Sequence, residues 1–345
     1  MTAVDLDRLS RWLRREGVGR EIGEVAPLTG GSQNIVLRIE LDGRPVVLRR
    51  PPEHPRPTSD RTLAREITIL SGLAGTDVPH PRLVAGCTDT SVLGVVFYLM
   101  ELVDGVNPGE QVTDAQRADE SLRHGQGLAV ARALGRLASV DPVAQGLDVL
   151  RKPGSFLGRQ VPQWLGQLES YREFPQWEGG LPDVELVARW LADNRPADTA
   201  PGMMHGDFHL NNVMLAREKP EVAAIVDWEM CTVGDPLLDL GWLMVTWPQA
   251  PRALRTGGRL AELGGLPSRA ELVEEFAASS GRSTERIDWY TALAGFKLGI
   301  VLEGTWARAT AGRAPKATGE LLHTNAVDLL RLSSAIVKGE WSVLA

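Results

Sequence analysis

Three polar residues between positions 203 and 247 have the types and the spacing that phosphoryl transfer requires. Asp207 and Asn212 lie five positions apart in the segment HGDFHLNN, and Asp227 follows a short apolar run at 223–226 that predicts a strand. In such a layout one loop carboxylate orients or deprotonates the attacking hydroxyl, while an asparagine and a second carboxylate hold magnesium against phosphates. Magnesium needs few protein oxygens because phosphates supply the remaining ligands. The pattern therefore predicts Asp207 as the catalytic residue and Asn212 and Asp227 as metal ligands.

The same segment also permits a transition-metal site. His205, Asp207 and His209 alternate, so on a strand all three would face one way and could bind a metal for hydrolysis. Gly206 and two asparagines favour a loop instead, but the metallohydrolase stays an alternative.

A structural role is a further alternative for the acidic residues, which are common in caps and turns. Asp235 precedes Pro236 at the start of an apolar helix, which is typical of an N-cap. Asp239 could have such a capping role, or its carboxylate could hydrogen-bond the backbone of the loop that carries Asp207. The sequence does not decide between these two roles of Asp239.

The motifs HGDxxxxN, IVDW and GDPLLDL resemble those of the aminoglycoside phosphotransferase and choline kinase-like superfamily, over about residues 28–332. Within it, the chain is most similar to phosphotransferase domains fused to, or encoded near, acyl-CoA dehydrogenases, which Arg159 and Trp164 also suggest. The resemblance implies an α+β, two-lobed protein kinase-like fold. Residues 1–102 would form a small antiparallel β-sheet N-lobe with one helix, and residues 103–345 a larger, mainly helical C-lobe.

The N-terminal part carries the expected nucleotide-binding groups. Gly30, Gly31 and Ser32 precede a strand and predict a flap whose backbone N–H groups meet phosphates. Asp42-Gly43 then predicts a hairpin. On its second strand Val47 would cover the adenine, and Arg49 stands where protein kinases place a phosphate-binding lysine.

Two further segments complete this expected site. The helix that begins at 59–60 carries Glu66, which in the family frame pairs with Arg49. The buried strand at 95–103 resembles the hinge between the lobes, with Met100 at the back of the pocket and the backbone of Glu101 and Val103 at the adenine edge. Helical periodicity predicts helices at 122–140, 156–171, 184–194, 270–280, 287–309 and 319–337.

The composition limits the class of protein and its partners. A formal net charge of -7 over 345 residues lacks the basic surface that nucleic-acid binding requires. Cys87 and Cys231 provide no disulfide framework, and no apolar run approaches the ~20 residues that span a bilayer. The charged N-terminus lacks a signal peptide's apolar core. We expect a cytoplasmic enzyme that binds neither nucleic acid nor membrane; the oligomeric state stays undetermined.

The resemblance implies transfer of the γ-phosphoryl group of ATP, with GTP as an alternative donor and Mg²⁺ as cofactor, to a hydroxyl of a small molecule. Residues 281–323, expected on the acceptor side with the connections at 251–259 and 309–317, contain six bases and four acids. This favours an uncharged or anionic acceptor, such as a hydroxyacyl thioester, over a polycationic aminoglycoside. An aminoglycoside phosphotransferase, a non-catalytic nucleotide-binding protein and a metallohydrolase remain alternatives. Whether Arg159, Lys297 and Arg308 contact substrate stays open.

Overall fold

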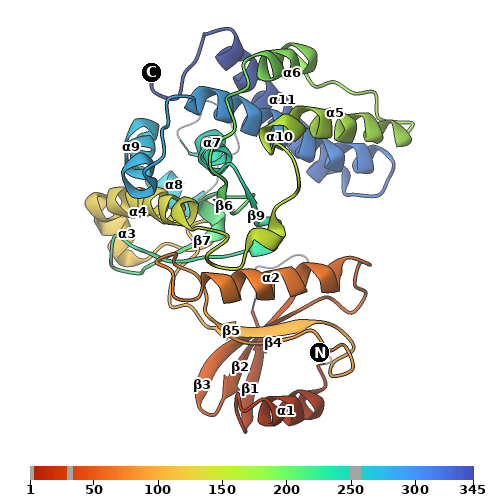
Figure 1. The fold of residues 1–345 in the computed structure, drawn as a ribbon, viewed down its shortest axis with the longest axis vertical. Helices are drawn as coiled ribbons and strands as arrows, with labels where there is room; N and C mark the ends of the chain where they lie inside the picture. The colour runs from red at the N-terminus through yellow and green to blue at the C-terminus, as the bar shows by residue number, and fades with distance from the viewer. Residues whose placement is uncertain (1–3, 29–33, 249–257) are drawn as a thin grey trace.

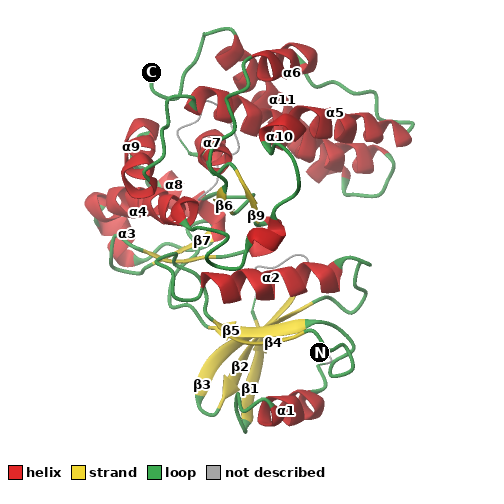
Figure 2. Cartoon of the chain, in the orientation of Figure 1, coloured by secondary structure: helices red, strands yellow, loops and turns green. Residues whose placement is uncertain are grey.

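The chain folds into a small β-rich lobe and a larger helical lobe (Figure 1). The structure, a computed structural model, describes residues 4–28, 34–248 and 258–345. Figure 2 shows the long strands gathered in the small lobe, while helices make up most of the other. This is the two-lobed α+β architecture that the sequence predicts. The boundary at residues 102 and 103 stays a prediction, although β5 ends at Glu101.

The small lobe is built on one antiparallel sheet with the strand order β1-β2-β3-β5-β4. The predicted hairpin is present between β2 and β3, where Asp42 and Gly43 both have positive φ angles of 49° and 77°. Such angles match the two-residue turn that follows the twist of antiparallel strands. The strands are β1 (Ile22–Pro27), β2 (Ile35–Leu41), β3 (Arg44–Arg50), β4 (Leu83–Cys87) and β5 (Phe97–Glu101).

Two helices cover the opposite faces of this sheet. Leu9 and Trp12 of α1 (Leu6–Arg15) pack with Phe97, whose ring lies 5.0 Å from that of Trp12. Helix α2 (Ser59–Leu73) covers the face that carries Tyr98. Helix α2 is the one helix expected within this lobe, and α1, which precedes the sheet in the chain, packs on its other face.

The larger lobe surrounds two short antiparallel ribbons, β6 with β9 and β7 with β8. Its helices are α3 (Asp114–Ala118), α4 (Glu120–Ser139), α5 (Gln160–Ser170), α6 (Val184–Asp193), α7 (Leu237–Thr246), α8 (Gly258–Glu262), α9 (Arg269–Ser280), α10 (Ile287–Thr310) and α11 (Lys316–Val337). Its strands are β6 (Gly202–Met204), β7 (Val213–Leu215), β8 (Val222–Ile225) and β9 (Thr232–Gly234). The 3-10 turns are η1 (Asp148–Leu150), η2 (Leu157–Arg159), η3 (Tyr171–Glu173), η4 (Leu210–Asn212) and η5 (Trp228–Met230).

Helices α7 and α10 form the centre of this lobe because they are apolar on nearly all sides. Every residue of α7 is buried, and α10 carries fully buried Phe296 and Ile300. A helix with this pattern belongs to the interior of a domain. The predicted helices are all present, with bounds that differ by no more than a few residues. Among the described residues, no helix is both long and apolar enough to cross a membrane.

Candidate active site

The catalytic loop joins β6 to β7 and brings Asp207 and Asn212 together. The side-chain amide of Asn212 donates to the backbone oxygen of Asp207 at 2.8 Å and to its carboxylate at 3.2 Å. The loop turns at Gly206, whose φ is +87° and where a Cβ would lie 2.5 Å from the Met230 oxygen. Only glycine meets both conditions, which explains the Gly before Asp207.

His209 shares the surroundings of Asp207. Its Nδ1 accepts a hydrogen bond from the Asn211 amide at 3.2 Å, and its Nε2 lies 3.5 Å from the Asp207 carboxylate and 3.4 Å from the Asn212 amide nitrogen. Burial alone would raise the pKa of Asp207, but the hydrogen bond and charge of His209 outweigh it and lower the pKa. Asp207 is therefore ionised at neutral pH and able to accept a proton.

Asp239 anchors the catalytic loop from α7. Its carboxylate accepts hydrogen bonds from the backbone amides of His205 at 2.5 Å and Gly206 at 3.0 Å. The Asp239 side chain is buried. Of the two roles that the sequence left open for Asp239, the structure has the loop contact. Asp235 lies one residue before the helix cap and accepts the Leu237 amide at 3.2 Å.

We expect the contribution of Asp239 to stability to depend on pH, because burial raises its pKa to about 6. An unfolded aspartate titrates near ~3.9, so between about pH 4 and pH 6 the folded carboxyl binds more protons and the free energy of unfolding falls as pH rises. The difference of two pKa units corresponds to about 3 kcal/mol.

Urea unfolding of wild type and Asp239→Asn at several pH values measures this effect. The stability of wild type relative to the variant should fall between about pH 4 and pH 6 and stay constant above about pH 7. A difference that does not change with pH would mean that burial does not perturb Asp239.

Arg49 connects the two lobes through an ion-pair network. Its Nε lies 3.1 Å from Glu66 of α2, and its Nη2 lies 3.2 Å from Asp227. The Tyr98 hydroxyl donates a hydrogen bond to the Glu66 carboxylate at 2.6 Å, which extends the network to β5. Burial opposes the charge of Arg49, but the negative charges of Glu66 and Asp227 outweigh it and raise the pKa of Arg49. The predicted pair of Arg49 and Glu66 is therefore present, and Glu66 is buried instead of exposed.

Asp227 follows β8 in a left-handed backbone conformation, with φ of 65°. Such a conformation is uncommon outside glycine, although Asp and Asn tolerate it best. Its side chain is 43% exposed, and its carboxylate faces the Arg49 guanidinium. With the amide oxygen of Asn212, it would offer the hard oxygen ligands that suit magnesium, and this role stays a prediction.

The nucleotide side of the site is only partly described. Gly30, Gly31 and Ser32 lie outside the described residues. Val47 is buried on β3 opposite Met100 of β5, on the same face as Arg49. Glu101 ends β5, and Val103 follows it. Their roles toward a nucleotide stay predictions.

A transition-metal site does not form from the residues proposed for it. Strand β6 ends before His205, so the three side chains do not alternate along one strand. The His205 ring is buried against Phe208 and Trp228, and its Nε2 lies 2.9 Å from the Val226 oxygen. In the part of the chain that the structure describes, no group of three His, Cys, Asp or Glu residues could hold a metal ion.

A cavity of about 790 Å³ opens beside the catalytic loop, between α2 and residues 149–164. Gly206 and Glu229 lie in its wall. Its basic lining residues are Arg61, Arg65, Arg151, Lys152, Arg159 and Lys297. Among described residues Arg151 alone of these pairs with a carboxylate, that of Asp148 at 3.0 Å. The cavity is therefore strongly positive.

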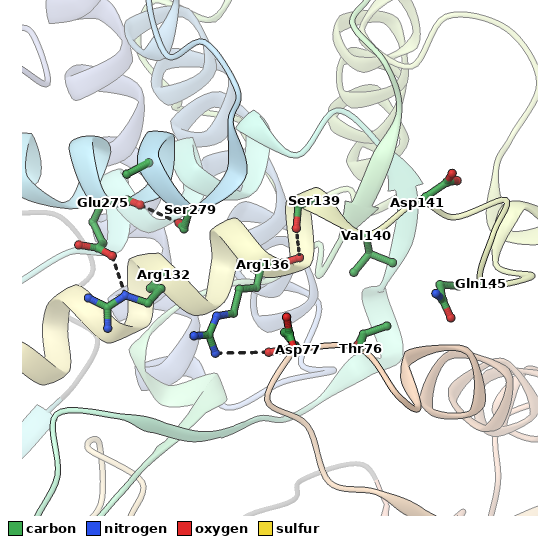
Figure 3. Close-up of a pocket in the computed structure, with 11 residues that line it drawn as sticks. Thr76, Asp77, Arg132, Arg136, Ser139, Val140, Asp141, Gln145, Glu275 and Ser279 are labelled. Carbon is green, nitrogen blue, oxygen red and sulfur yellow. Dashed lines mark hydrogen bonds and ion pairs between the residues drawn. The ribbon is translucent and has the colours of Figure 1, made fainter.

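A second cavity, of about 620 Å³, lies between α4, α9 and the loop after α2 (Figure 3). Both of its arginines are already engaged. Arg132 pairs with Glu275 at 2.7 Å, and Arg136 donates to the backbone oxygen of Asp77 at 3.4 Å. Neither catalytic-loop nor Arg49-network residues line it, so we do not assign it to the reaction site.

Residues 24–273, more than half of the chain, match the phosphotransferase enzyme family. The chain belongs to this family. Mouse acyl-CoA dehydrogenase family member 10 is 29% identical to it over 325 residues, which cover 92% of this chain but 30% of that protein. The chain therefore spans less than a third of this relative's length.

Solved structures of phosphotransferases share the fold. A Ralstonia eutropha protein, provisionally named an aminoglycoside phosphotransferase, has a TM-score of 0.81 and 27% identity, covering 98% of this chain and 99% of that one. A thermostable mutant of an aminoglycoside phosphotransferase, in a ternary complex with ADP and hygromycin B, has a TM-score of 0.57 and 13% identity, with 97% and 99% coverage. At this identity the second likeness concerns the fold alone.

Two side chains near this site, those of Tyr98 and Glu229, were missed from the sequence. Tyr98 holds Glu66 from a strand 32 positions away, which no local motif indicates. Glu229 lines the positive cavity, and burial together with the charge of Asp227 raises its pKa. The connection at 309–317 does not line this cavity, and most of 251–259 lies outside the described residues, so their place beside an acceptor stays a prediction.

Proposed function

We propose that this protein transfers the γ-phosphoryl group of ATP to a hydroxyl of a small molecule of the hydroxyacyl-CoA type, with GTP as the alternative donor. The observation that carries the proposal is two contacting pairs of expected site residues, which lie near each other because the Asn212 backbone oxygen accepts a hydrogen bond from the Val226 amide, next to Asp227, at 2.9 Å. Asp207 and Asn212 lie in hydrogen-bond contact on the catalytic loop, and Asp227 contacts Arg49 across the lobes. The types of these groups match the parts that phosphoryl transfer requires.

The reaction needs one bond to form and one to break. The acceptor oxygen bonds to the γ-phosphorus while the bond from that phosphorus to the β–γ bridging oxygen breaks, which releases ADP. Asp207 accepts the hydroxyl proton and passes it to water. Because little covalent chemistry falls to the protein, positioning and charge neutralisation carry most of the rate.

Arg49 is suited to hold phosphates. Glu66 and Tyr98 fix its orientation, and its Nη1 has no partner among the residues that the structure describes. Arginine presents several donors in a rigid fork that matches phosphate oxygens. Asn212 and Asp227 would hold Mg²⁺, which, when bound, neutralises phosphate charge and aligns the phosphoryl group.

The positive cavity supports an anionic acceptor. It lies beside Gly206, directly before Asp207, and contains six basic side chains against one acidic one. Its volume falls within the usual range of small-molecule sites. Several ammonium groups of an aminoglycoside would meet like charge there, whereas coenzyme A carries phosphates that these bases can match.

An acceptor panel tests this proposal. With magnesium and ATP, short and medium hydroxyacyl-CoA esters should be phosphorylated with kcat/KM at least about 100-fold above that of any aminoglycoside, because like charge disfavours a polycation by several kcal/mol. Product formation is followed by mass spectrometry. Efficient phosphorylation of kanamycin-like compounds, with no phosphorylated thioester formed, would contradict the proposed acceptor class. Nucleotide binding without product from any hydroxyl compound would instead indicate a non-catalytic module.

A further inference from the structure

Lys297 is a buried base on α10 that the reaction described above does not use. Its side chain is 8% exposed, and its neighbours Phe296 and Leu298 on the helix are buried and apolar. It nevertheless lies in the wall of the positive cavity, together with Gly206 and Trp164. An ammonium in such surroundings is costly unless hydrogen bonds or opposite charge compensate for lost water.

The compensation for this charge is incomplete. Lys297 donates one hydrogen bond, to the Gly206 oxygen at 3.3 Å, and an ammonium has three N–H donors. No carboxylate lies within ion-pair distance of it among the described residues. Burial lowers the pKa of Lys297, although the charges of Asp239 and Asp207 oppose this. The remaining donors therefore call for an oxygen from outside the chain.

Two tryptophans fix the position of this ammonium. The Nζ atom lies 4.5 Å from the ring centre of Trp242 and 5.5 Å from that of Trp164. Rings at this distance attract a cation through their faces, but they offer no oxygen acceptor. Lys297 is thus held at a set place in the wall without having its hydrogen-bonding capacity filled.

We propose that Lys297 binds the acyl oxygen of the acceptor and so selects acceptors that carry such an oxygen close to the hydroxyl. The inference rests on the proposed function, because it assigns the contents of the same cavity. Gly206 directly precedes Asp207, so an oxygen bound at Lys297 lies near a hydroxyl that Asp207 orients. The exposed bases Arg61 and Lys152 are left for more distant phosphates.

A matched pair of acceptors isolates this contact. One is a hydroxyacyl-CoA thioester, and the other is the thioether analogue in which a methylene replaces the carbonyl. The free hydroxy acid, as a third acceptor, distinguishes a carboxylate from a thioester oxygen. Wild type should favour the thioester over the thioether in kcat/KM by about 10- to 100-fold, the range expected for one hydrogen bond to a charged group.

Lys297→Met should reduce this preference to less than about threefold, and Lys297→Gln, which keeps an N–H donor without charge, should give an intermediate ratio. Lys316→Met is the control, because Lys316 is 80% exposed on α11 and pairs with Glu320. It should keep the wild-type ratio. If Lys297 only supports the Gly206 carbonyl, Lys297→Met lowers kcat/KM equally for the thioester and the thioether. The ratio of the two kcat/KM values then stays at the wild-type value, which would overturn the inference.

Calorimetry with the same two compounds separates this inference from the proposed function. If no acceptor is phosphorylated, yet wild type binds the thioester more tightly than the thioether and Lys297→Met removes the difference, the inference stands and the phosphotransferase proposal fails. If wild type binds the two compounds equally, or binds neither, Lys297 does not bind an acyl oxygen. This wild-type measurement decides the question even if a variant does not fold.

Discussion

Asp207→Asn should lower kcat by about 10²–10⁴-fold, the usual size of a general-base or orienting contribution, while nucleotide affinity stays within about threefold. An amide keeps the shape of the side chain and one acceptor for the Asn212 amide at 3.2 Å, so the loop should keep its conformation. The lost property is the ability to accept the hydroxyl proton. Steady-state kinetics with the best acceptor and calorimetry with ATP measure the two effects.

Glu229→Gln is the matched comparison, because Glu229 is another carboxylate close enough to Asp207 to feel its charge, and it lies in the wall of the cavity beside the catalytic loop. Burial raises the pKa of Glu229, which makes it the rival proton acceptor. If Asp207→Asn keeps turnover within about threefold of wild type, Asp207 has no part in the reaction. A larger loss in Glu229→Gln than in Asp207→Asn would transfer the role to Glu229.

Asp227→Ala should abolish magnesium-dependent nucleotide binding and reduce turnover by at least about 100-fold. Mutation of residues that merely orient metal ligands typically lowers metal affinity or activity by about 10- to 100-fold, and loss of a direct ligand should cost at least as much. Calorimetry of ATP binding, with magnesium and with a chelator present, tests this. In wild type the chelator should weaken binding strongly, and in the variant it should change nothing.

The backbone at Asp227 requires a control, because its φ is 65° and alanine is strained there. Asp227→Asn suits that conformation better and also removes the negative charge. Both variants should lose the magnesium effect, whereas only Asp227→Ala should also lose stability through strain. Unchanged magnesium-ATP affinity in both variants would make Asp227 a structural residue whose partner is Arg49.

The parts of the site that could be predicted are those encoded in short segments. Asp207 and Asn212 meet because the loop between β6 and β7 carries both, and their spacing of five positions is read directly from the sequence. The pairing of Arg49 with Glu66 followed from the family frame and the order of strand and helix. Local periodicity likewise predicted the helices, since each buried stripe lies within one continuous segment.

The positive cavity, which we propose as the acceptor side, could not be predicted because the fold assembles it from distant segments. The charge count over 281–323 was a poor guide to it. Arg282 donates to the Ala138 oxygen at 3.0 Å, Arg286 donates to the Asn194 oxygen at 2.9 Å, and only Lys297 of that stretch lines the positive cavity. The other bases of the cavity come from α2 and from 151–159, whose proximity only the tertiary structure reveals.

The central claim is transfer of a phosphoryl group to a hydroxyl, and ³¹P NMR of the complete reaction tests it most directly. Protein, magnesium, ATP and a hydroxyacyl-CoA ester are followed over time. The account predicts that the γ-phosphate signal of ATP falls while ADP and a new phosphate monoester appear in equal amounts, and that Asp207→Asn suppresses both. Release of inorganic phosphate without a monoester, or unchanged ATP with every hydroxyl compound tried, would contradict it.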